Sequence, residues 1–367
     1  MGSVRNYRFL FLPLILVVAG IHAEGSSEDN VSISGVAQVG RILTGSHTIN
    51  HPPVTLRWHR DGSPISVGGY LKSGEGGVSG MSGSRSSRVS PDGRHLYVGG
   101  YSDGTLAWFN RDPYSGDLQY VNKLTNGENG VDGLGSVTGM AFSAGGEHFY
   151  ATGGWGQNAI SWYDRNASSG ELLWQGVLKD GENGVDGLFS AGKIAISADG
   201  NFVYVTAYDD DAVSWFQRDL STGALTWAGM IKDNQGGVDG LDGARDLILS
   251  PDGSFLYASG QVDSAIAFFD RNETTGSLTF LGIVRDGLDG VDGLGAVTSI
   301  DLSSNGTHLY ASSQHDHSLV WFDRNASTGT LTYRNIFRNG DQGSDGLSAT
   351  FSAEVSTDGK RLYCMGQ

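Results

Sequence analysis

The sequence predicts an all-β fold, a β-propeller of six four-stranded blades. The first observation is an internal repeat, in which a motif of the type S-P-D-G recurs at spacings of 53, 54, 53, 53 and 53 residues. Its six copies begin at Ser90, Ser143, Ser197, Ser250, Ser303 and Ser356. The second observation is composition, because 57 of the 367 residues are Gly and 37 are Phe, Tyr or Trp (15, 14 and 8). These glycines are too aperiodic for collagen, and the aromatic residues are too many for a disordered chain.

Four strand-like runs make up each repeat. The run HLYVGG (95–100) follows the first S-P-D-G turn, and the aromatic run LAWFNRD (106–112) follows it and is closed by a Ser-Gly turn. A third run such as LTWAGMIKD (225–233) leads to a loop close to GVDGL, and a fourth run such as RDLILS (245–250) enters the next motif. Runs of β-branched and aromatic residues between Gly, Asp, Asn and Ser turns are typical of strands. Four antiparallel strands in about 40 to 50 residues are typical of a propeller blade.

The ends of the repeat predict how the ring closes. The last copy stops after its second strand, whereas residues 54–77 have the pattern of a third and a fourth strand. We therefore expect these N- and C-terminal strands to complete one shared blade, which removes two open sheet edges. The propeller is expected to span residues 54–367, preceded by an N-terminal extension over residues 24–53. Seven blades are the alternative, but the extension is short for a further four-stranded blade.

The N-terminus and the charge predict a secreted, acidic protein. Arg5 and Arg8 precede an apolar run over residues 9–19, and small residues follow, so residues 1–23 are expected to be a cleaved signal peptide. A membrane anchor is the alternative, but the run is shorter than the ~18 apolar residues that a span needs. The formal charge of −16, from 24 basic and 40 acidic residues, disfavours a nucleic-acid binder. A single cysteine excludes a disulfide framework.

Five N-x-S/T sequons are candidate glycosylation sites on surface turns. They stand at Asn30, Asn166, Asn272, Asn305 and Asn325. The alternative is chance in a chain rich in Asn, Ser and Thr. Three of the five occupy one repeat position, which favours an exposed turn in either case.

The repeat resembles a known family. The segments SPDGRHLYVGG, SADGNFVYVTA and SPDGSFLYASG, each followed by a W-F-D-R-D type run and a T-G turn, are similar to the YVTN-type, lactonase-like β-propellers, which usually have seven blades. The resemblance covers residues 54–367. It implies that the strand ending in the S-P-D-G serine is the innermost strand. It also implies that ligands meet the face of the GVDGL loops or the central channel.

Charged residues on the innermost strands are the main candidates for function. Counting back from each serine, the first and third places are apolar and the second and fourth should face the channel, because side chains alternate along a strand. Six of these twelve channel positions hold Gly, Ala or Ser, and five are charged: Arg88, Lys193, Asp246, Asp301 and Glu354. Arg85 and Arg245, nearer the loop face, are a candidate anion clamp. Three carboxylates on consecutive blades are expected to raise the pKa of one of them and make it a general acid or base. The alternative is a water-filled channel whose charges neutralise one another.

The glycine-acid loops are a candidate Ca²⁺ site. The densest copy, DGLDGVDG (286–293), contains Asp286, Asp289 and Asp292, and carboxylates interleaved with Gly can wrap this cation. The loops repeat an aspartate in five blades, at Asp132, Asp186, Asp239, Asp292 and Asp345. The alternative is that these aspartates cap the turns through Asx hydrogen bonds.

Two functions follow from these candidates. The first is a secreted propeller that binds a small polar molecule, a glycan or an extracellular protein on its loop face or in its channel, without chemistry of its own. The alternative is a lactonase-like enzyme that hydrolyses or isomerises a lactone or related cyclic compound in the channel. In that enzyme Asp301 or Glu354 is the acid or base, and Arg88 is the partner of an oxyanion or carboxylate. No nucleic-acid partner and no membrane span after signal cleavage are expected.

Overall fold

The computed structural model describes residues 71–341, 346–356, 359 and 361–366. Of the first 70 residues it gives the backbone of six short strands: β1 (Tyr7–Phe9), β2 (Ile15–Ala19), β3 (Asn30–Ile33), β4 (Leu43–Thr48), β5 (Arg57–Arg60) and β6 (Ser63–Ser66). The predicted signal-peptide cleavage, the side chain of Asn30 and the loop aspartate Asp345 lie outside the described residues.

Five four-stranded antiparallel sheets follow one another along the chain. The first blade contains β7 (Ser86–Val89), β8 (His95–Gly100), β9 (Thr105–Arg111) and β10 (Leu118–Thr125). The second blade contains β11 (Val137–Phe142), β12 (His148–Gly153), β13 (Ala159–Arg165) and β14 (Leu172–Lys179). The third blade contains β15 (Ala191–Ile196), β16 (Phe202–Ala207), β17 (Ala212–Arg218) and β18 (Leu225–Lys232). The fourth blade contains β19 (Ala244–Leu249), β20 (Phe255–Gly260), β21 (Ala265–Arg271) and β22 (Leu278–Arg285). The fifth blade contains β23 (Val297–Leu302), β24 (His308–Ser313), β25 (Ser318–Arg324) and β26 (Leu331–Arg338).

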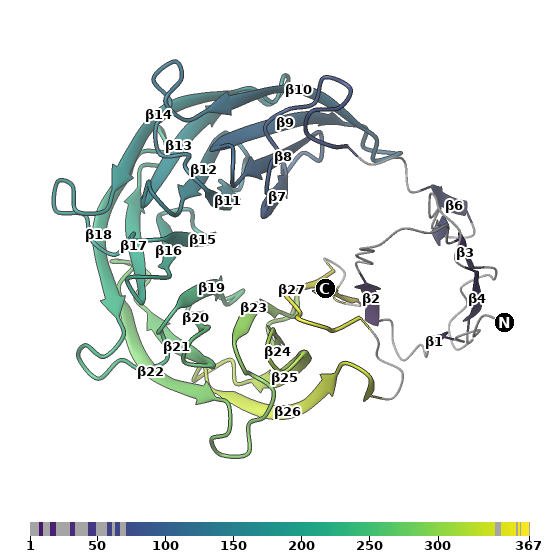
Figure 1. Ribbon diagram of the computed structural model, residues 1–367. Coiled ribbons are helices and arrows are strands. Elements are labelled where there is room, and N and C mark those ends of the chain that lie inside the picture. The colour runs from purple at the N-terminus through teal and green to yellow at the C-terminus, as the bar shows by residue number, and fades with distance from the viewer. Residues whose placement is uncertain are drawn as a thin grey trace.

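The sheets are arranged as propeller blades. Their first strands, β7, β11, β15, β19 and β23, lie around the centre, and their fourth strands lie at the rim (Figure 1). Contacts between the first strands of consecutive blades continue from β7 to β27 (Ser352–Val355). The described residues contain no α-helix. The predicted all-β propeller and its innermost strand are therefore confirmed.

The last two strands close against a different partner from the one expected. Strand β27 pairs with β28 (Leu362–Gly366), and β28 pairs in parallel on its other side with β2, a strand of the uncleaved chain that lies within the predicted signal peptide. Strands β5 and β6, within the segment expected to supply two strands of this blade, pair with each other. The hydrophobic pattern marked strands at both ends of the chain, but it carried no information about which of them pair.

The hydrophobic core lies between neighbouring blades. Between the fourth and fifth blades, Tyr257 and Phe268 pack in one cluster with Ile300 and Leu302. The latter two are the third and first positions before a motif serine, which were expected to be apolar core. All six residues of β20 are buried. Both faces of a blade are thus covered, which explains the near-continuous apolar runs in the sequence.

A buried arginine joins each blade to the one before it at four junctions, a feature that we call the arginine–tyrosine junction. The arginine Nε donates to a tyrosine hydroxyl of the preceding blade, at 2.6 to 2.9 Å. The pairs are Arg165 with Tyr97, Arg218 with Tyr150, Arg271 with Tyr204, and Arg324 with Tyr257. The arginines are no more than 7% exposed. Sequence reasoning missed this role, although Arg and Tyr recur at constant spacing.

The glycine of the S-G or T-G turn is required at each of these junctions. Gly170 has φ +73°, and a Cβ there would lie 2.4 Å from the His95 ring of the preceding blade. Its carbonyl oxygen accepts a hydrogen bond of 2.6 Å from the Tyr97 hydroxyl. Left-handed backbone and close packing together leave no room for a side chain.

Candidate functional site

Asp246, on the innermost strand of the fourth blade, is 6% exposed. Its Oδ1 accepts a hydrogen bond of 2.9 Å from the Leu247 N–H. Its Oδ2 accepts one of 3.1 Å from the Ile300 N–H, on the innermost strand of the fifth blade. The carboxylate therefore links the inner strands of two neighbouring blades.

Asp301 repeats this arrangement one blade further on. Its Oδ1 accepts from the Leu302 N–H at 2.8 Å, and its Oδ2 accepts from the Val355 N–H of β27 at 2.6 Å. Burial raises the pKa of the Asp301 carboxyl to about 6, and the charges of Glu354 and Asp246 act in the same direction against the two backbone hydrogen bonds. Glu354 and Asp246, the other two predicted channel acids, thus both lie within electrostatic reach of Asp301. We call Asp246, Asp301 and Glu354 the acidic group.

Arg245 and Arg85 lie at the loop-face end of the inner strands. Arg245 Nη1 donates to Gln261 Oε1 at 2.7 Å, and Gln261 Nε2 donates to Gln314 Oε1 at 3.3 Å. The Arg85 guanidinium lies over the Tyr101 ring, 4.0 Å from its centroid. Burial lowers the pKa of Arg245, the Arg85 charge lowers it further, and Tyr208 and Asp246 oppose this. We call the two arginines Arg85 and Arg245, together with the neutral amide Gln261 that accepts from Arg245, the basic group.

Gln261 and Gln314 were not singled out in the sequence. They occupy one repeat position, in the loop after the second strand, where the first and third blades have Tyr101 and Tyr208. The change from aromatic residue to amide was the available signal.

The other two predicted channel cations are not joined to the acidic group. Arg88 is exposed, and its Nε donates to the Met140 carbonyl oxygen of the second blade at 3.1 Å. Lys193 is half-buried on β15, and its backbone N–H donates to Thr206 Oγ1 at 2.9 Å. Within the described residues, no hydrogen bond or ion pair connects either side chain to Asp246, Asp301 or Glu354.

The loop aspartates of residues 286–293 are engaged in turn capping and ion pairing. Asp286 Oδ1 accepts from the N–H groups of Gly293 and Leu294, at 2.8 and 2.9 Å. Asp292 pairs with Arg338 at 2.6 Å, which holds the pKa of that carboxyl below its usual value. Asp289 has φ +52°. Asp286 thus caps the turn, whereas Asp292, the repeated aspartate of this loop, forms an ion pair, and Ca²⁺ binding by this loop stays a prediction.

Two other clusters of aspartates form where the connection between two blades meets a loop between the second and third strands of the later blade. Each brings carboxylate oxygens within 4.8 Å of one another: Asp180, Asp186 and Asp210, and then Asp233, Asp239 and Asp263. Each cluster also contacts one basic side chain. Lys232 lies 3.3 Å from Asp210, and Arg285 lies 2.6 Å from Asp239. The sequence did not reveal these groups, since their members come from different turns.

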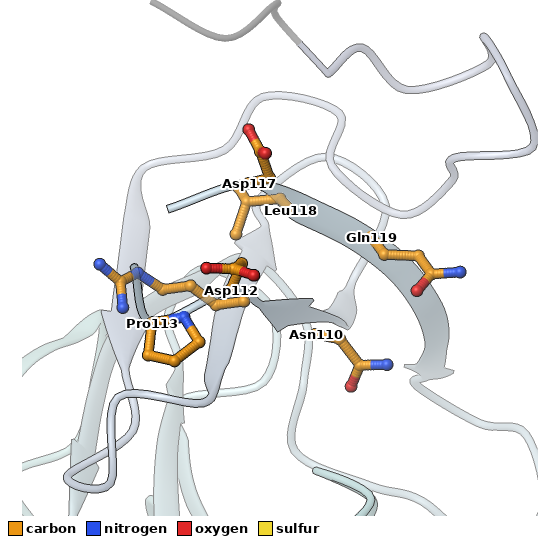
Figure 2. Close-up of a pocket in the computed structure, with 7 residues that line it drawn as sticks. Asn110, Asp112, Pro113, Asp117, Leu118 and Gln119 are labelled. Carbon is orange, nitrogen blue, oxygen red and sulfur yellow. The ribbon is translucent and has the colours of Figure 1, made fainter. Parts of the chain in front are cut away.

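A shallow hollow lies at the turn between β9 and β10, remote from the inner strands. Figure 2 shows it lined by Asn110, Asp112, Pro113, Asp117, Leu118 and Gln119, together with Arg111. Asp112 Oδ1 accepts from the Tyr114 and Ser115 N–H groups, both at 2.8 Å. Its carboxylate thus caps the turn.

The raised pKa of Asp301 predicts a pH-dependent stability. Its folded pKa of about 6 lies above the ordinary value of 3.8, so the folded protein binds more protons than the unfolded chain between these values. The contribution of this group to the unfolding free energy therefore falls as pH rises. Urea unfolding should measure this effect. The unfolding free energy of wild type minus that of Asp301→Asn should be about 2 kcal/mol larger at pH 4.5 than at pH 7.5. A difference that does not change with pH would contradict the assignment.

The comparisons with known proteins agree with the fold. Residues 139–286, from β11 to the end of the fourth blade, match the family model described as lactonase, 7-bladed beta-propeller. This match confirms the resemblance to lactonase-like propellers, and its seven blades are the number held as the alternative. No curated protein matches the chain. Within the described residues, no helix could span a membrane.

Solved structures share the architecture at low identity. A putative 6-phosphogluconolactonase from Bacteroides fragilis has a TM-score of 0.62 at 18% identity, covering 97% of this chain and 86% of its own. The periplasmic gluconolactonase of Pseudomonas aeruginosa has a TM-score of 0.60 at 19% identity, covering 97% and 87%. A putative 6-phosphogluconolactonase from Bacteroides uniformis has a TM-score of 0.58 at 19% identity, covering 75% and 76%. At these identities the likeness concerns the fold alone.

Proposed function

We propose that this propeller, similar to the lactonases over its second to fourth blades, opens the ring of a lactone in its central channel. The observation that carries the proposal is Asp301, a carboxyl whose pKa is raised to about 6 by burial, with Glu354 and Asp246 adding to the effect. Acid–base catalysis is most efficient when the pKa of the catalytic group lies near the working pH. Perturbed acids also cluster at functional sites.

Ring opening requires a base that removes a proton from the attacking water and an acid that gives a proton to the departing ring oxygen. A water molecule attacks the lactone carbonyl carbon, the bond from this carbon to the ring oxygen breaks, and the product is a hydroxy acid. In the proposed mechanism the Asp301 carboxylate accepts the proton of the attacking water and returns it to the ring oxygen as that oxygen leaves. Glu354, which is exposed on the neighbouring strand, is the second candidate for either transfer. Isomerisation of a related cyclic compound uses the same pair without the water.

The basic group suggests which lactones bind. Arg245 and Arg85 carry positive charge at the loop-face end of the channel, and Gln261 continues the hydrogen-bonding surface. Guanidinium groups suit carboxylates and phosphates, and amides suit hydroxyl groups. We therefore propose a hydroxylated lactone with an anionic substituent. Arg88, the partner named from the sequence, is the weaker candidate because its guanidinium bonds the Met140 carbonyl.

A panel of lactones tests the function. The full chain is incubated with neutral aldonolactones and their carboxylated or phosphorylated counterparts, and acid release is followed by pH-stat. Turnover of at least one lactone above the spontaneous rate supports the proposal. Calorimetric binding of a panel member without turnover favours the binding function instead. The absence of both binding and turnover overturns the proposed channel site.

Removing the Arg245 charge separates binding from chemistry. We expect Arg245→Met to raise KM for an anionic lactone about tenfold or more, because a charge-assisted hydrogen bond contributes about 1.5 to 3 kcal/mol. The kcat should change little, and KM for the neutral parent lactone should rise less. Arg94→Met, on an exposed turn at the other face, is the control. An equal rise in KM for charged and neutral lactones would contradict the anion contact.

A further inference from the structure

Four asparagines of sequons lie exposed on one face of the propeller. Asn166, Asn272 and Asn325 begin the turn from the third to the fourth strand of their blades, and Asn305 lies in an S-x-x-G turn. Neighbouring strands of a blade are antiparallel, so the first and third strands run in the same direction and end on the same face. We call this side the turn face. Arg245 and Gln261 lie toward the opposite face.

The side chains of these asparagines are held in one arrangement. Asn166 Oδ1 accepts from the N–H and the hydroxyl of Ser168, at 2.9 and 2.7 Å. Asn325 accepts in the same way from Ser327, at 2.9 and 2.8 Å, and Asn305 from Thr307, at 3.1 and 2.8 Å. Asn272 accepts from the Thr274 N–H at 2.9 Å. Within the described residues their amide nitrogens donate no hydrogen bond, so the amide oxygen is occupied and the nitrogen is available.

The turn itself does not require asparagine. Asp219 occupies the same repeat position in the third blade, and its Oδ1 accepts from the N–H and hydroxyl of Ser221 at 2.8 and 2.6 Å. Asp112, in the first blade, accepts from two backbone N–H groups at 2.8 Å. Aspartate thus caps this turn as asparagine does, and cannot accept a glycan. Capping alone therefore does not explain asparagine at three of the five positions.

We propose that Asn166, Asn272, Asn305 and Asn325 carry N-linked glycans that coat the turn face and leave the loop face and channel open. Each amide nitrogen loses a proton and bonds to the anomeric carbon of an oligosaccharide. The donor is a lipid diphosphate-linked oligosaccharide, whose bond from that carbon to the phosphate oxygen breaks as lipid diphosphate leaves. Asparagine exposure allows the folded blade to keep the attached sugar without losing a packing contact. This inference is independent of the lactonase proposal, and it implies export through a eukaryotic secretory pathway.

The test is site mapping of the full chain, secreted by eukaryotic cells from its own N-terminus. Peptide-N-glycosidase in H₂¹⁸O converts each glycosylated asparagine to ¹⁸O-labelled aspartate, and we expect label at all four positions. Asp219→Asn completes an N-x-S sequon with Ser221 and should add a fifth labelled site on the turn face. Asp112→Asn is the matched control, because Pro113 and Tyr114 follow it, and it should stay unlabelled.

Substitution by aspartate separates glycan loss from misfolding. The triple variant Asn166→Asp, Asn272→Asp and Asn325→Asp should lose three labelled sites. When both chains are produced in bacteria without glycosylation, the variant should keep the Tm of wild type, because Asp112 and Asp219 already cap this turn. Secreted protein without label at the four sites overturns the proposal. Retention of the unlabelled chain inside the cells overturns it as well, as does an unlabelled Asp219→Asn variant.

Discussion

Asp301→Asn is expected to lower kcat for the best lactone of the panel by about 10²- to 10⁴-fold, the range of a general acid or base. The amide cannot exchange a proton with water or with the ring oxygen. The pKa of Asp301 in the folded protein, raised to about 6, predicts that kcat/KM rises with pH up to about this value and then levels, because the carboxylate is the active form. The residual kcat/KM of the variant should not show this rise with pH. A pH series of initial rates on both proteins measures the effect.

Asp246→Asn is the matched control for that experiment. Both aspartates accept a backbone N–H from the next blade, Ile300 for Asp246 and Val355 for Asp301. Both substitutions therefore weaken a link between inner strands. If the loss of turnover arises from this link, the two variants should be equally impaired. If Asp301 transfers protons, Asp246→Asn should retain most of the turnover at pH 7.5, where the Asp301 carboxyl is ionised in both proteins, and equal losses at that pH would falsify the assignment.

Arg165→Met is expected to lower the unfolding free energy by about 2 to 3 kcal/mol, because it removes several hydrogen bonds to buried groups at once, although its ion-pair partner Asp92 is exposed. Arg165 donates to the Tyr97 hydroxyl at 2.9 Å and the Gly146 carbonyl at 3.2 Å, and lies 2.9 Å from the nearer oxygen of Asp92. Its Nη2 also lies 2.8 Å from His95 Nδ1. Methionine fills a similar volume but satisfies none of these groups. Urea denaturation followed by tryptophan fluorescence and far-UV circular dichroism measures the loss.

Arg111 provides the control at the same repeat position. It lies in the first blade, is half-buried, and donates to the Gly93 carbonyl at 3.0 Å. Arg111→Met should therefore cost about 1 kcal/mol or less. Equal destabilisation by the two substitutions would mean that the stabilisation does not come from the contacts with the preceding blade.

Much of the fold could be predicted because propeller blades are local. A blade is made of consecutive strands joined by short turns, so its strands, turns and buried faces are encoded within about 53 residues of chain. Alternation along the inner strands also separated apolar positions such as Ile300 from polar positions such as Asp301. The partner of the last strand was different, because β28 pairs with β2, more than 300 residues away in the chain.

The candidate site was predicted only in part, for a related reason. Because side chains alternate along a strand, the sequence predicts on which face of the sheet each side chain lies. It does not predict the distance to a side chain on another blade. Asp246, Asp301 and Glu354 are on consecutive blades, and the charges of the first and the third act on Asp301 between them. Arg88 is on the first blade, and it bonds the backbone of the second. The loop aspartate clusters likewise depend on two turns that meet in space.

The sequence by itself determined the class of architecture, the strand order within each blade and the faces that strands bury. These follow from local turn chemistry and from the spacing of apolar residues. Only the tertiary structure decided which charged side chains lie close enough to interact and which arginines join neighbouring blades. It also decided that four sequons lie on one face. Coulomb energies and hydrogen bonds depend on distances between atoms that the chain brings together only when the blades pack.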